Sequence, residues 1–237
     1  MKKAIVIGAT SGIGKELAKL MAGYGYTVGI AGRRLELLQE LQREFPGKIH
    51  IKRLDISQPA AMCLLKELIS EMGGADVVVI SSGTGFINKE LDWAKEKETI
   101  DVNATGFAAM ANVAFKHFRA VGTGQLVGLS SIAAIRGSGG APAYNASKSF
   151  VSNYLEGLRQ NAAKAGLPIT VTCIEAGLVD TAMAKGEGLF WVAAPQKAAR
   201  QILNTIEDKK MHAYITKRWR LIAWLLKCIP ARLYCRF

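Results

Sequence analysis

Short apolar runs alternate along the chain with longer amphipathic stretches. The apolar runs are rich in β-branched residues and predict strands at 4–8, 26–31, 49–54, 76–81, 125–130, 168–174 and 212–216. Between them, apolar residues recur at helical spacing over 12–24, 34–45, 58–72, 92–119, 143–165 and 195–208. Several strands are apolar almost throughout, which is typical of strands buried on both faces of a parallel sheet.

This alternation predicts an α/β fold: a single Rossmann-type, doubly wound parallel sheet of about seven strands with helices on both faces. No linker or internal repeat interrupts the pattern, so residues 1–216 are expected to form one domain. Residues 217–237 are expected to add a basic amphipathic helix or tail.

Composition narrows the class of protein. Half of the 237 residues are hydrophobic and 24 are Gly, which suits a folded domain with many tight turns. The four Cys have no metal-binding spacing, so we expect no metal site and reduced thiols in a cytoplasmic protein. No apolar run reaches about eighteen residues, and no signal peptide or membrane span is predicted.

A glycine turn follows the first strand directly. It reads GATSGIG from Gly8 to Gly14 and leads into a helix, which is the context of a dinucleotide-binding motif. Gly8 allows the turn, Gly12 lets the backbone approach a pyrophosphate, and Gly14 allows close helix–strand packing. Free N–H groups at the helix start would bind phosphates. The candidate cofactor contacts here are Gly8, Thr10, Ser11, Gly12, Ile13 and Gly14.

The end of the second strand indicates which dinucleotide would bind. It reads AGRR, with no acid before Glu36. A carboxylate there would hold the ribose hydroxyls of NAD, whereas a guanidinium pairs with a 2′-phosphate. We therefore predict NADP(H), with Arg33 as the main contact and Arg34 or Ser11 assisting. The alternative is that both arginines are solvated residues at a helix start.

The stretch YNASK places Tyr144 and Lys148 one helical turn apart on one face. A free Tyr has a pKa of about 10, and a neighbouring ammonium favours the phenolate. We therefore expect Lys148 to lower the pKa of Tyr144 toward the range where it exchanges a proton with a reacting carbonyl.

Four motifs occur in one order: GATSGIG, the DVNATG that contains Asn103, the pair Ser130–Ser131, and YNASK. Ser131 precedes Tyr144 by thirteen residues. In these features, over residues 1–216, the sequence resembles the short-chain dehydrogenase/reductase family. The resemblance implies that Tyr144 acts as general acid/base and that Ser131 donates to the substrate oxygen. It further implies that Lys148 binds the nicotinamide ribose and that Asn103 holds a water in a proton relay.

The resemblance also assigns contacts elsewhere and reveals two departures. It implies adenine contacts at Asp55 and Ile56, and further cofactor contacts at Ser82, Gly83, Asn103, Tyr144, Lys148, Gly177, Val179 and Thr181. The family's Asn-Asn-Ala-Gly is replaced by residues 80–83, which read Ile-Ser-Ser-Gly, and its Pro-Gly is replaced by Ala-Gly at 176–177. These changes affect the expected local geometry and leave the reaction class unchanged.

The substrate pocket is expected between the loops 132–143 and 182–194. The second loop contains Phe190 and Trp191, with Met183, Leu189 and a single acid, Glu187. Together with Ser131 and Tyr144, Phe190 and Trp191 are the candidate substrate contacts, and they favour an apolar carbonyl or alcohol such as a 3-oxoacyl or keto-lipid compound. The alternative is that both aromatic residues only pack a lid onto the body.

The last residues are strongly basic. From 209 to 237 there are eight Lys or Arg and no acid, within a net charge of +12. In a helix, Arg220 and Lys227 share one face, opposite Leu221, Ile222, Trp224, Leu225, Cys228 and Ile229. Such a helix either lies in a membrane interface, at the inner surface of the membrane, or packs on its own sheet or a partner subunit. Nucleic acid is not expected, because no recognised binding module is present.

The sequence therefore predicts an NADP(H)-dependent oxidoreductase that interconverts a carbonyl and a secondary alcohol. An NADP-binding sensor or scaffold with little turnover is the alternative. The family resemblance also implies a homodimer or homotetramer, formed through the helices that carry Asn103 and Tyr144.

Overall fold

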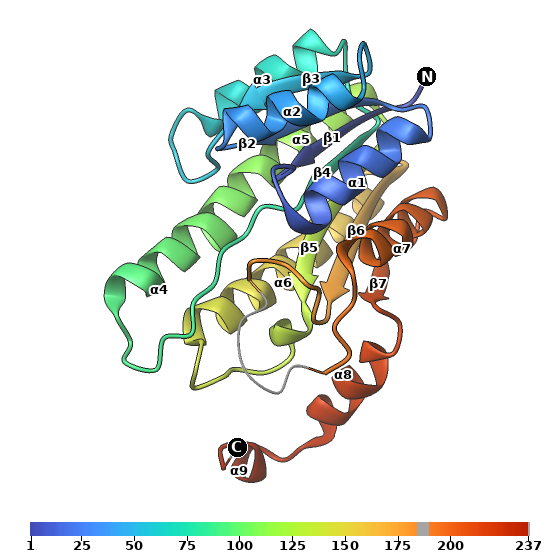
Figure 1. Ribbon diagram of the computed structural model, residues 1–237. Helices are drawn as coiled ribbons and strands as arrows, with labels where there is room; N and C mark the ends of the chain where they lie inside the picture. The colour runs from blue at the N-terminus through green and yellow to red at the C-terminus, as the bar shows by residue number, and fades with distance from the viewer. Residues whose placement is uncertain (184–189, 237) are drawn as a thin grey trace.

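The computed structural model describes residues 1–183 and 190–236, and its centre is a seven-stranded parallel sheet (Figure 1). The strand order is β3-β2-β1-β4-β5-β6-β7. The strands are β1 (Lys3–Ile7), β2 (Thr27–Gly32), β3 (Ile49–Arg53), β4 (Val77–Ile80), β5 (Gly124–Ser131), β6 (Ile169–Ala176) and β7 (His212–Ile215). The predicted α/β fold with a doubly wound parallel sheet is confirmed.

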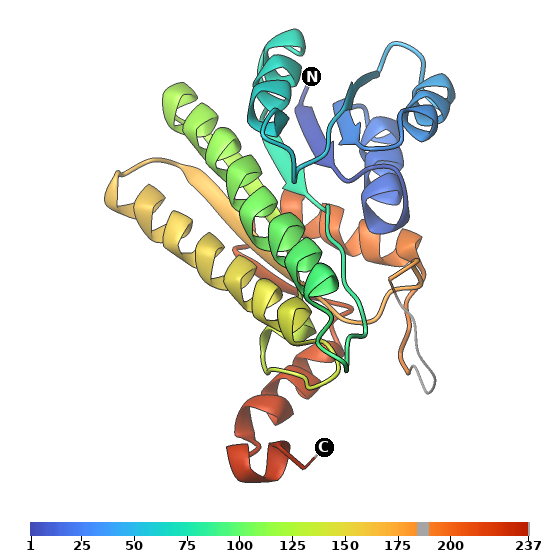
Figure 2. The same ribbon diagram turned by 90° about the vertical axis from the view of Figure 1, so that its left-hand side faces the viewer.

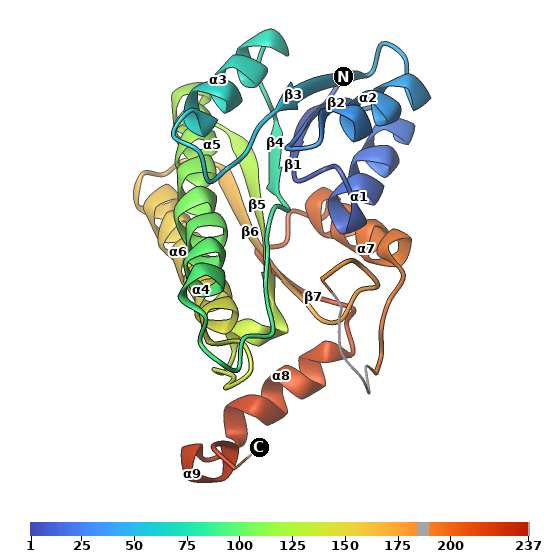
Figure 3. The same cartoon turned by 60° about the vertical axis from the view of Figure 1, so that its left-hand side comes forward.

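Helices cover both faces of the sheet (Figure 3). The helices of the described residues are α1 (Gly12–Gly23), α2 (Leu35–Glu44), α3 (Ala61–Glu71), α4 (Trp93–Ile100), α5 (Phe107–Val121), α6 (Pro142–Lys164), α7 (Pro195–Glu207), α8 (Trp219–Cys228) and α9 (Ala231–Tyr234). Helices α1, α2 and α7 pack on one face, over Ala4 and Val6 of β1. Helices α3, α5 and α6 pack on the other, over Ile5 and Ile7. Alternate residues of β1 therefore point into two separate apolar cores.

One predicted helix differs from the structure. The single helix expected over 92–119 is α4, a π-helical segment Asp101–Gly106 and α5 in succession. A Cβ added at Gly106 would lie 2.7 Å from the carbonyl oxygen of Ile56, so this segment passes very close to the chain after β3. The continuous helical periodicity conceals the π turn, which carries Asn103. Figure 2 shows α5 and α6 running side by side on this face.

The order of the strands reverses between β1 and β4, where β1 pairs with β2 on one side and with β4 on the other. Crevices at such switch points, beyond the carboxyl ends of the strands, are the usual ligand sites of open α/β sheets. Gly8 follows β1 at this point with a φ of 91°, and a Cβ added there would lie 2.6 Å from the backbone nitrogen of Ser82. The segment that follows β1 and the segment that follows β4 are therefore in direct backbone contact.

The C-terminal segment leaves the body of the protein as α8 and α9 (Figures 1 and 3). In α8, Trp219 and Ala223 are buried, whereas Leu221, Trp224 and Leu225 are exposed. Among the described residues, no helix combines the length and the hydropathy that a membrane crossing needs.

Replacing a buried leucine should cost far more stability than replacing an exposed one. Leu17 of α1 is fully buried, so we expect Leu17→Ala to lower the free energy of unfolding by about 2–5 kcal/mol. The matched control is Leu221→Ala, at a leucine that is 67 % exposed, and it should change the value by less than about 0.5 kcal/mol. Urea denaturation followed by circular dichroism measures both. Equal losses would contradict the described burial.

Candidate active site

Ser131, Tyr144 and Lys148 meet at the carboxyl end of β5. Ser131 is the last residue of β5, and α6 begins at Pro142, a residue favoured in the first helical turn because it lacks an N–H. Tyr144 and Lys148 follow in the first two turns of α6, and the Lys148 Nζ lies 5.7 Å from the centroid of the Tyr144 ring. The predicted proximity of these residues is therefore present.

The electrostatics of this cluster differ from the sequence expectation. Burial raises the pKa of Tyr144, and the hydrogen bond with the Ser131 side chain lowers it. Burial also lowers the pKa of Lys148 to about 8, and its Nζ donates to the carbonyl oxygen of Leu129 at 3.0 Å. The net direction for the pKa of Tyr144 is therefore opposite to the one expected from the sequence: burial outweighs the Ser131 hydrogen bond, and the Lys148 ammonium is directed to a backbone carbonyl.

The Ser131 hydroxyl is held between backbone groups. Its Oγ donates to the carbonyl oxygen of Ala176 at 3.2 Å and accepts from the N–H of Ala133 at 3.2 Å. Ala176 occupies the position of the family's proline, and its carbonyl oxygen accepts the hydrogen bond from Ser131. The neighbouring Ser130 bonds to the Lys148 carbonyl oxygen at 2.9 Å, which ties β5 to α6.

Asn103 fixes the chain that follows β4. Its Oδ1 accepts from the N–H of Thr84 at 2.9 Å, and its Nδ2 donates to the Thr84 carbonyl oxygen at 2.7 Å and to Ser147 Oγ at 3.0 Å. A Cβ added at Gly83 would lie 3.4 Å from both Asn103 Oδ1 and Lys148 Nζ. Asn103 and Lys148 therefore flank the same glycine, although no hydrogen bond joins them among the described residues.

Gly85 is a site residue that the sequence analysis missed. A Cβ added there would lie 2.6 Å from Cδ2 of Tyr144, so only glycine leaves room for the Tyr144 ring. The signal that could have found it is the second glycine of SSGTG, residues 81–85. The comparison with the family's Asn-Asn-Ala-Gly motif ends at Gly83 and therefore does not include it. Where the family has asparagines, the N–H of Ser81 bonds to the Ile7 carbonyl oxygen at 2.8 Å, so backbone pairing still joins the two strand ends.

The glycine turn has the geometry of a phosphate cradle. Gly12 has a φ of 55°, and a Cβ added at Gly14 would lie 2.3 Å from the Gly8 carbonyl oxygen, so a larger residue does not fit there. Ser11, at the start of α1, makes no side-chain cap, and the first turn of α1 contains no acid. The N–H groups of this first turn therefore lack a side-chain acceptor, which suits an anion. Thr10 and Ile13 lie in the same turn.

Arg34 forms hydrogen bonds to this turn, and Arg33 forms none among the described residues. The Arg34 Nη2 donates to Thr10 Oγ1 at 2.7 Å and to Ser11 Oγ at 2.9 Å. Arg33 is exposed and makes no hydrogen bond or ion pair within the described residues. The sequence had given Arg33 the main role, but Arg34 is the guanidinium that is held beside two hydroxyl groups.

The remaining predicted contacts border the same crevice. Asp55 caps the turn after β3 by accepting from Ser57, and Ile56 packs against Gly106. The Thr181 methyl group would lie 3.0 Å from a Cβ added at Gly12, so the segment after β6 reaches the glycine turn. Val179 forms a parallel bridge with Ala193, which closes the base of the loop between them.

The aromatic residues of this loop pack on α8. Phe190 lies 5.2 Å and Trp191 6.0 Å, between ring centroids, from Trp219. Trp219 also fills the space beside Gly177, where an added Cβ would lie 2.2 Å from its indole ring. These contacts support the alternative in which Phe190 and Trp191 pack the loop onto the body of the protein. The sequence analysis did not single out Trp219 as their partner. Its spacing of four residues from Ala223, which places both on one face of a helix, was the signal that could have found it. Glu187 and Leu189 lie outside the described residues.

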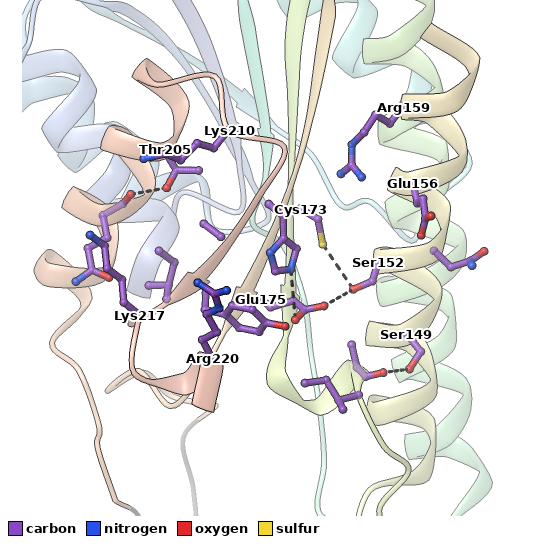
Figure 4. Close-up of a pocket in the computed structure, with 18 of the residues that line it drawn as sticks. Ser149, Ser152, Glu156, Arg159, Cys173, Glu175, Thr205, Lys210, Lys217 and Arg220 are labelled. Carbon is purple, nitrogen blue, oxygen red and sulfur yellow. Dashed lines mark hydrogen bonds and ion pairs between the residues drawn. The ribbon is translucent and has the colours of Figure 1, made fainter. Parts of the chain in front are cut away.

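A groove of about 1220 Å³ lies between α6, β6, β7, α7 and α8 (Figure 4). Its lining includes Ser152, Cys173, Glu175 and Arg220 but none of Asn103, Ser131, Tyr144 or Lys148. Ser152, which lines the groove, has its Oγ 2.8 Å from Ser130 Oγ. The groove therefore lies next to Ser130, the neighbour of Ser131 in β5. Among the described residues, no three His, Cys, Asp or Glu side chains gather in a way that would hold a metal ion.

Comparison with known proteins gives a consistent result. The family model described as short chain dehydrogenase matches residues 2–189. A Myxococcus xanthus protein named "Uncharacterized oxidoreductase" is 38 % identical over 184 residues, which cover 75 % of this chain and 72 % of that protein. A Mycobacterium tuberculosis protein with the same description is 30 % identical, over 100 % of this chain and 97 % of its own. The crystal structure of a short-chain dehydrogenase from Streptomyces avermitilis aligns with a TM-score of 0.80 at 23 % identity, over 90 % of this chain and 88 % of that one, and shows the shared fold.

The lowered pKa of Lys148 predicts how stability depends on pH. In the cofactor-free protein the folded state releases this proton near pH 8, whereas an unfolded lysine keeps it to about 10.4. The unfolded state then binds more protons in this window, so the free energy of unfolding rises with pH through Lys148.

We therefore expect the stability difference between Lys148→Met and the wild type to shift in favour of the wild type by about 2–3 kcal/mol between pH 7.5 and 10. Urea denaturation at each pH measures this difference. Lys164→Met, at an exposed lysine of the same helix, is the control and should show no such pH dependence. A pH-independent difference for Lys148→Met would contradict the buried ammonium.

Proposed function

Since the chain belongs to the short-chain dehydrogenase/reductase family, we propose that it is an NADP(H)-dependent oxidoreductase that interconverts a carbonyl and a secondary alcohol. Members of this family are oxidoreductases that use nicotinamide cofactors and act on small molecules. The observation that carries the proposal is the meeting of Ser131, Tyr144 and Lys148 beside the glycine crevice.

The residues present fit a dinucleotide. The turn from Gly8 to Gly14 leaves space that a Cβ would fill, and the uncapped start of α1 offers N–H groups to a pyrophosphate. Asp55 and Ile56 would border the adenine, with Ser82 and Gly83 next to them along the crevice. Gly177, Val179 and Thr181 would hold the nicotinamide end. When bound, the nicotinamide supplies or accepts the hydride.

Tyr144 would hold and move the proton. Its phenol is buried and keeps its proton at neutral pH, so it can donate to the oxygen of a carbonyl substrate that becomes an alcohol. Ser131 would turn its hydroxyl from the Ala176 carbonyl to the same substrate oxygen and stabilise the charge that develops there. Lys148 would bind the nicotinamide ribose next to Tyr144. Asn103 fixes the backbone at Thr84 and would also hold a water molecule for a proton relay.

Arg34 supports the choice of NADP(H) over NAD(H). Its guanidinium lies with Thr10 and Ser11 at the glycine turn, and together these groups offer several donors to a 2′-phosphate. Arg33, exposed at the same strand end, would add long-range attraction. No carboxylate stands at this strand end to hold the 2′-hydroxyl of NAD.

Phe190 and Trp191 pack on Trp219 but remain 51 % and 38 % exposed, so they would still offer an apolar surface to a substrate. The three rings form one aromatic cluster at the segment that follows Gly177, next to the expected position of the nicotinamide. An apolar wall there favours a lipophilic carbonyl, such as a 3-oxoacyl or keto-lipid compound, over a charged one. We further propose a homodimer or homotetramer built on α5 and α6, whose Phe150 is 38 % exposed and stacks on Tyr154.

Tyr144→Phe should separate binding from chemistry. Removing the hydroxyl leaves the ring in place beside Gly85, so the variant is expected to bind NADPH as the wild type does. Turnover should fall by about a hundredfold to ten-thousandfold, because the proton donor is lost. NADPH oxidation with a panel of carbonyls, long-chain ones included, measures turnover, and fluorescence titration measures binding.

The matched control is Tyr154→Phe on the same helix, which should keep both properties. Near-normal turnover in Tyr144→Phe would contradict the mechanism. NADPH binding by the wild type without oxidation of any carbonyl in the panel would instead favour an NADP-binding sensor or scaffold.

Arg34→Ala should weaken NADPH binding selectively. We expect the Kd for NADPH to rise at least about tenfold, because a charged hydrogen-bond donor to the 2′-phosphate is lost. The Kd for NADH should change by less than about twofold. Arg33→Ala is the control and should have a smaller effect on NADPH. Equal loss for both cofactors, or a wild type that binds NADH as tightly as NADPH, would contradict the assignment.

A further inference from the structure

Helix α8 has two apolar sides, and the described part of the chain covers only one of them. Trp219 and Ala223, 4 % and 1 % exposed, face the body of the protein. Leu221, Trp224 and Leu225 are 67 %, 67 % and 51 % exposed. Their spacing of three and four residues places them on one stripe of the helix, on the side opposite Trp219. This outer stripe, Leu221, Trp224 and Leu225, has no cover within the described residues.

Positive charge borders the outer stripe on both sides. By helical spacing, Arg218 lies along one edge, where its guanidinium is 5.1 Å from the centroid of the Trp191 ring. Arg220 and Lys227 lie along the other edge, where both also line the groove of Figure 4. Residues 209–236 contain eight Lys or Arg and no acid. Only Lys210 among these eight forms an ion pair within the described residues, with Asp208. The outer stripe is therefore an apolar surface surrounded by positively charged residues.

Contacts to the loop after β5 fix the direction in which the stripe faces. Arg136 Nη1 donates to the carbonyl oxygens of Leu226 at 3.3 Å and Ile229 at 2.9 Å. Its guanidinium lies 4.3 Å from the ring centroid of Tyr234, whose hydroxyl donates to Gly137 at 2.6 Å. These contacts hold the C-terminal end of α8 and α9, and the buried Trp219 anchors the N-terminal end of α8. Helix α8 projects from the body of the protein (Figure 3), and its outer stripe lies on the side opposite the buried Trp219.

The composition around the stripe distinguishes two occupants. The cores of protein–protein interfaces are depleted of Lys, and two copies of this tail would bring like charges together. A bilayer surface accepts Trp and Leu at the level of the headgroups, while flanking Lys and Arg meet anionic lipids. Both the apolar and the charged parts of α8 fit the second environment.

We propose that the outer stripe and basic borders of α8 form a docking surface for an anionic lipid bilayer. Leu221, Trp224 and Leu225 enter the interface, and Arg218, Arg220 and Lys227 contact the lipid phosphates. The docking itself is independent of the proposed function. Where it bears on that function, Trp219 lies on the opposite side of the same helix and touches Phe190 and Gly177, so docking sets the candidate site close to the membrane.

Vesicle co-sedimentation of the full chain tests the proposal. The vesicles are phosphatidylcholine alone or phosphatidylcholine with about 30 % phosphatidylglycerol, and binding is expected only to the second. Trp224→Gln should reduce the partition coefficient at least about tenfold, through loss of buried apolar area. Trp93→Gln is its matched control, because Trp93 is 68 % exposed but lies on α4, and it should bind as the wild type does.

A charge pair of variants tests the borders. Lys227→Glu should reduce binding by about fivefold or more, and Lys164→Glu, the same change on α6, should have little effect. NADPH binding by each variant, measured in the same preparations, reports that the body is folded.

Three outcomes would overturn the proposal. One is no sedimentation with the anionic vesicles beyond the vesicle-free control. Another is equal binding by Trp224→Gln and Trp93→Gln. The third is an oligomer, measured by analytical ultracentrifugation, that Trp224→Gln dissociates and Trp93→Gln does not, since the stripe would then be a contact between subunits. Each readout is separate from turnover, so a failure here leaves the oxidoreductase proposal standing.

Discussion

Parallel pairing of all seven strands is the constraint on which the rest of the structure depends. Because every strand ends at the same edge, the chains after β1, β4, β5 and β6 converge there, although they are up to 170 residues apart in sequence. The turn after β1 contacts the chain after β4 through Gly8 and Ser82, and the segment after β6 reaches Gly12 through Thr181. A crevice with several different walls is thus a consequence of topology. The family resemblance then supplies the chemical meaning of the side chains that border it.

Burial governs the chemistry that those side chains can perform. Lys148 is held with its ammonium on a backbone carbonyl, and Tyr144 is enclosed between Ser131 and Gly85. In such surroundings the charged form of each group is less favoured than in water, so a small change in their neighbours shifts where a proton resides. A bound ligand that brings charge or hydrogen bonds to Lys148 would alter this balance.

The sequence was informative wherever one residue type has one physical use. Periodicity predicted the strands within a few residues, and GATSGIG predicted the turn, because glycine alone permits its backbone geometry and close contacts. It was less informative where the outcome depends on distant partners. The π turn at Asn103 coincides with the close passage of Gly106 by Ile56. The contacts of Arg34 depend on the positions of Thr10 and Ser11. The direction of the Lys148 ammonium was set by Leu129, a residue with no visible motif.

The bridge between Val179 and Ala193 has a consequence for how this protein relates to its family. It fixes both ends of the intervening segment to one point beside β6. The entropy of closing a loop on fixed ends grows only slowly with its length, so residues can be inserted, deleted or exchanged between these two positions at small cost to the fold. The sequence between these two positions can therefore vary while the sheet and the glycine turn stay as they are.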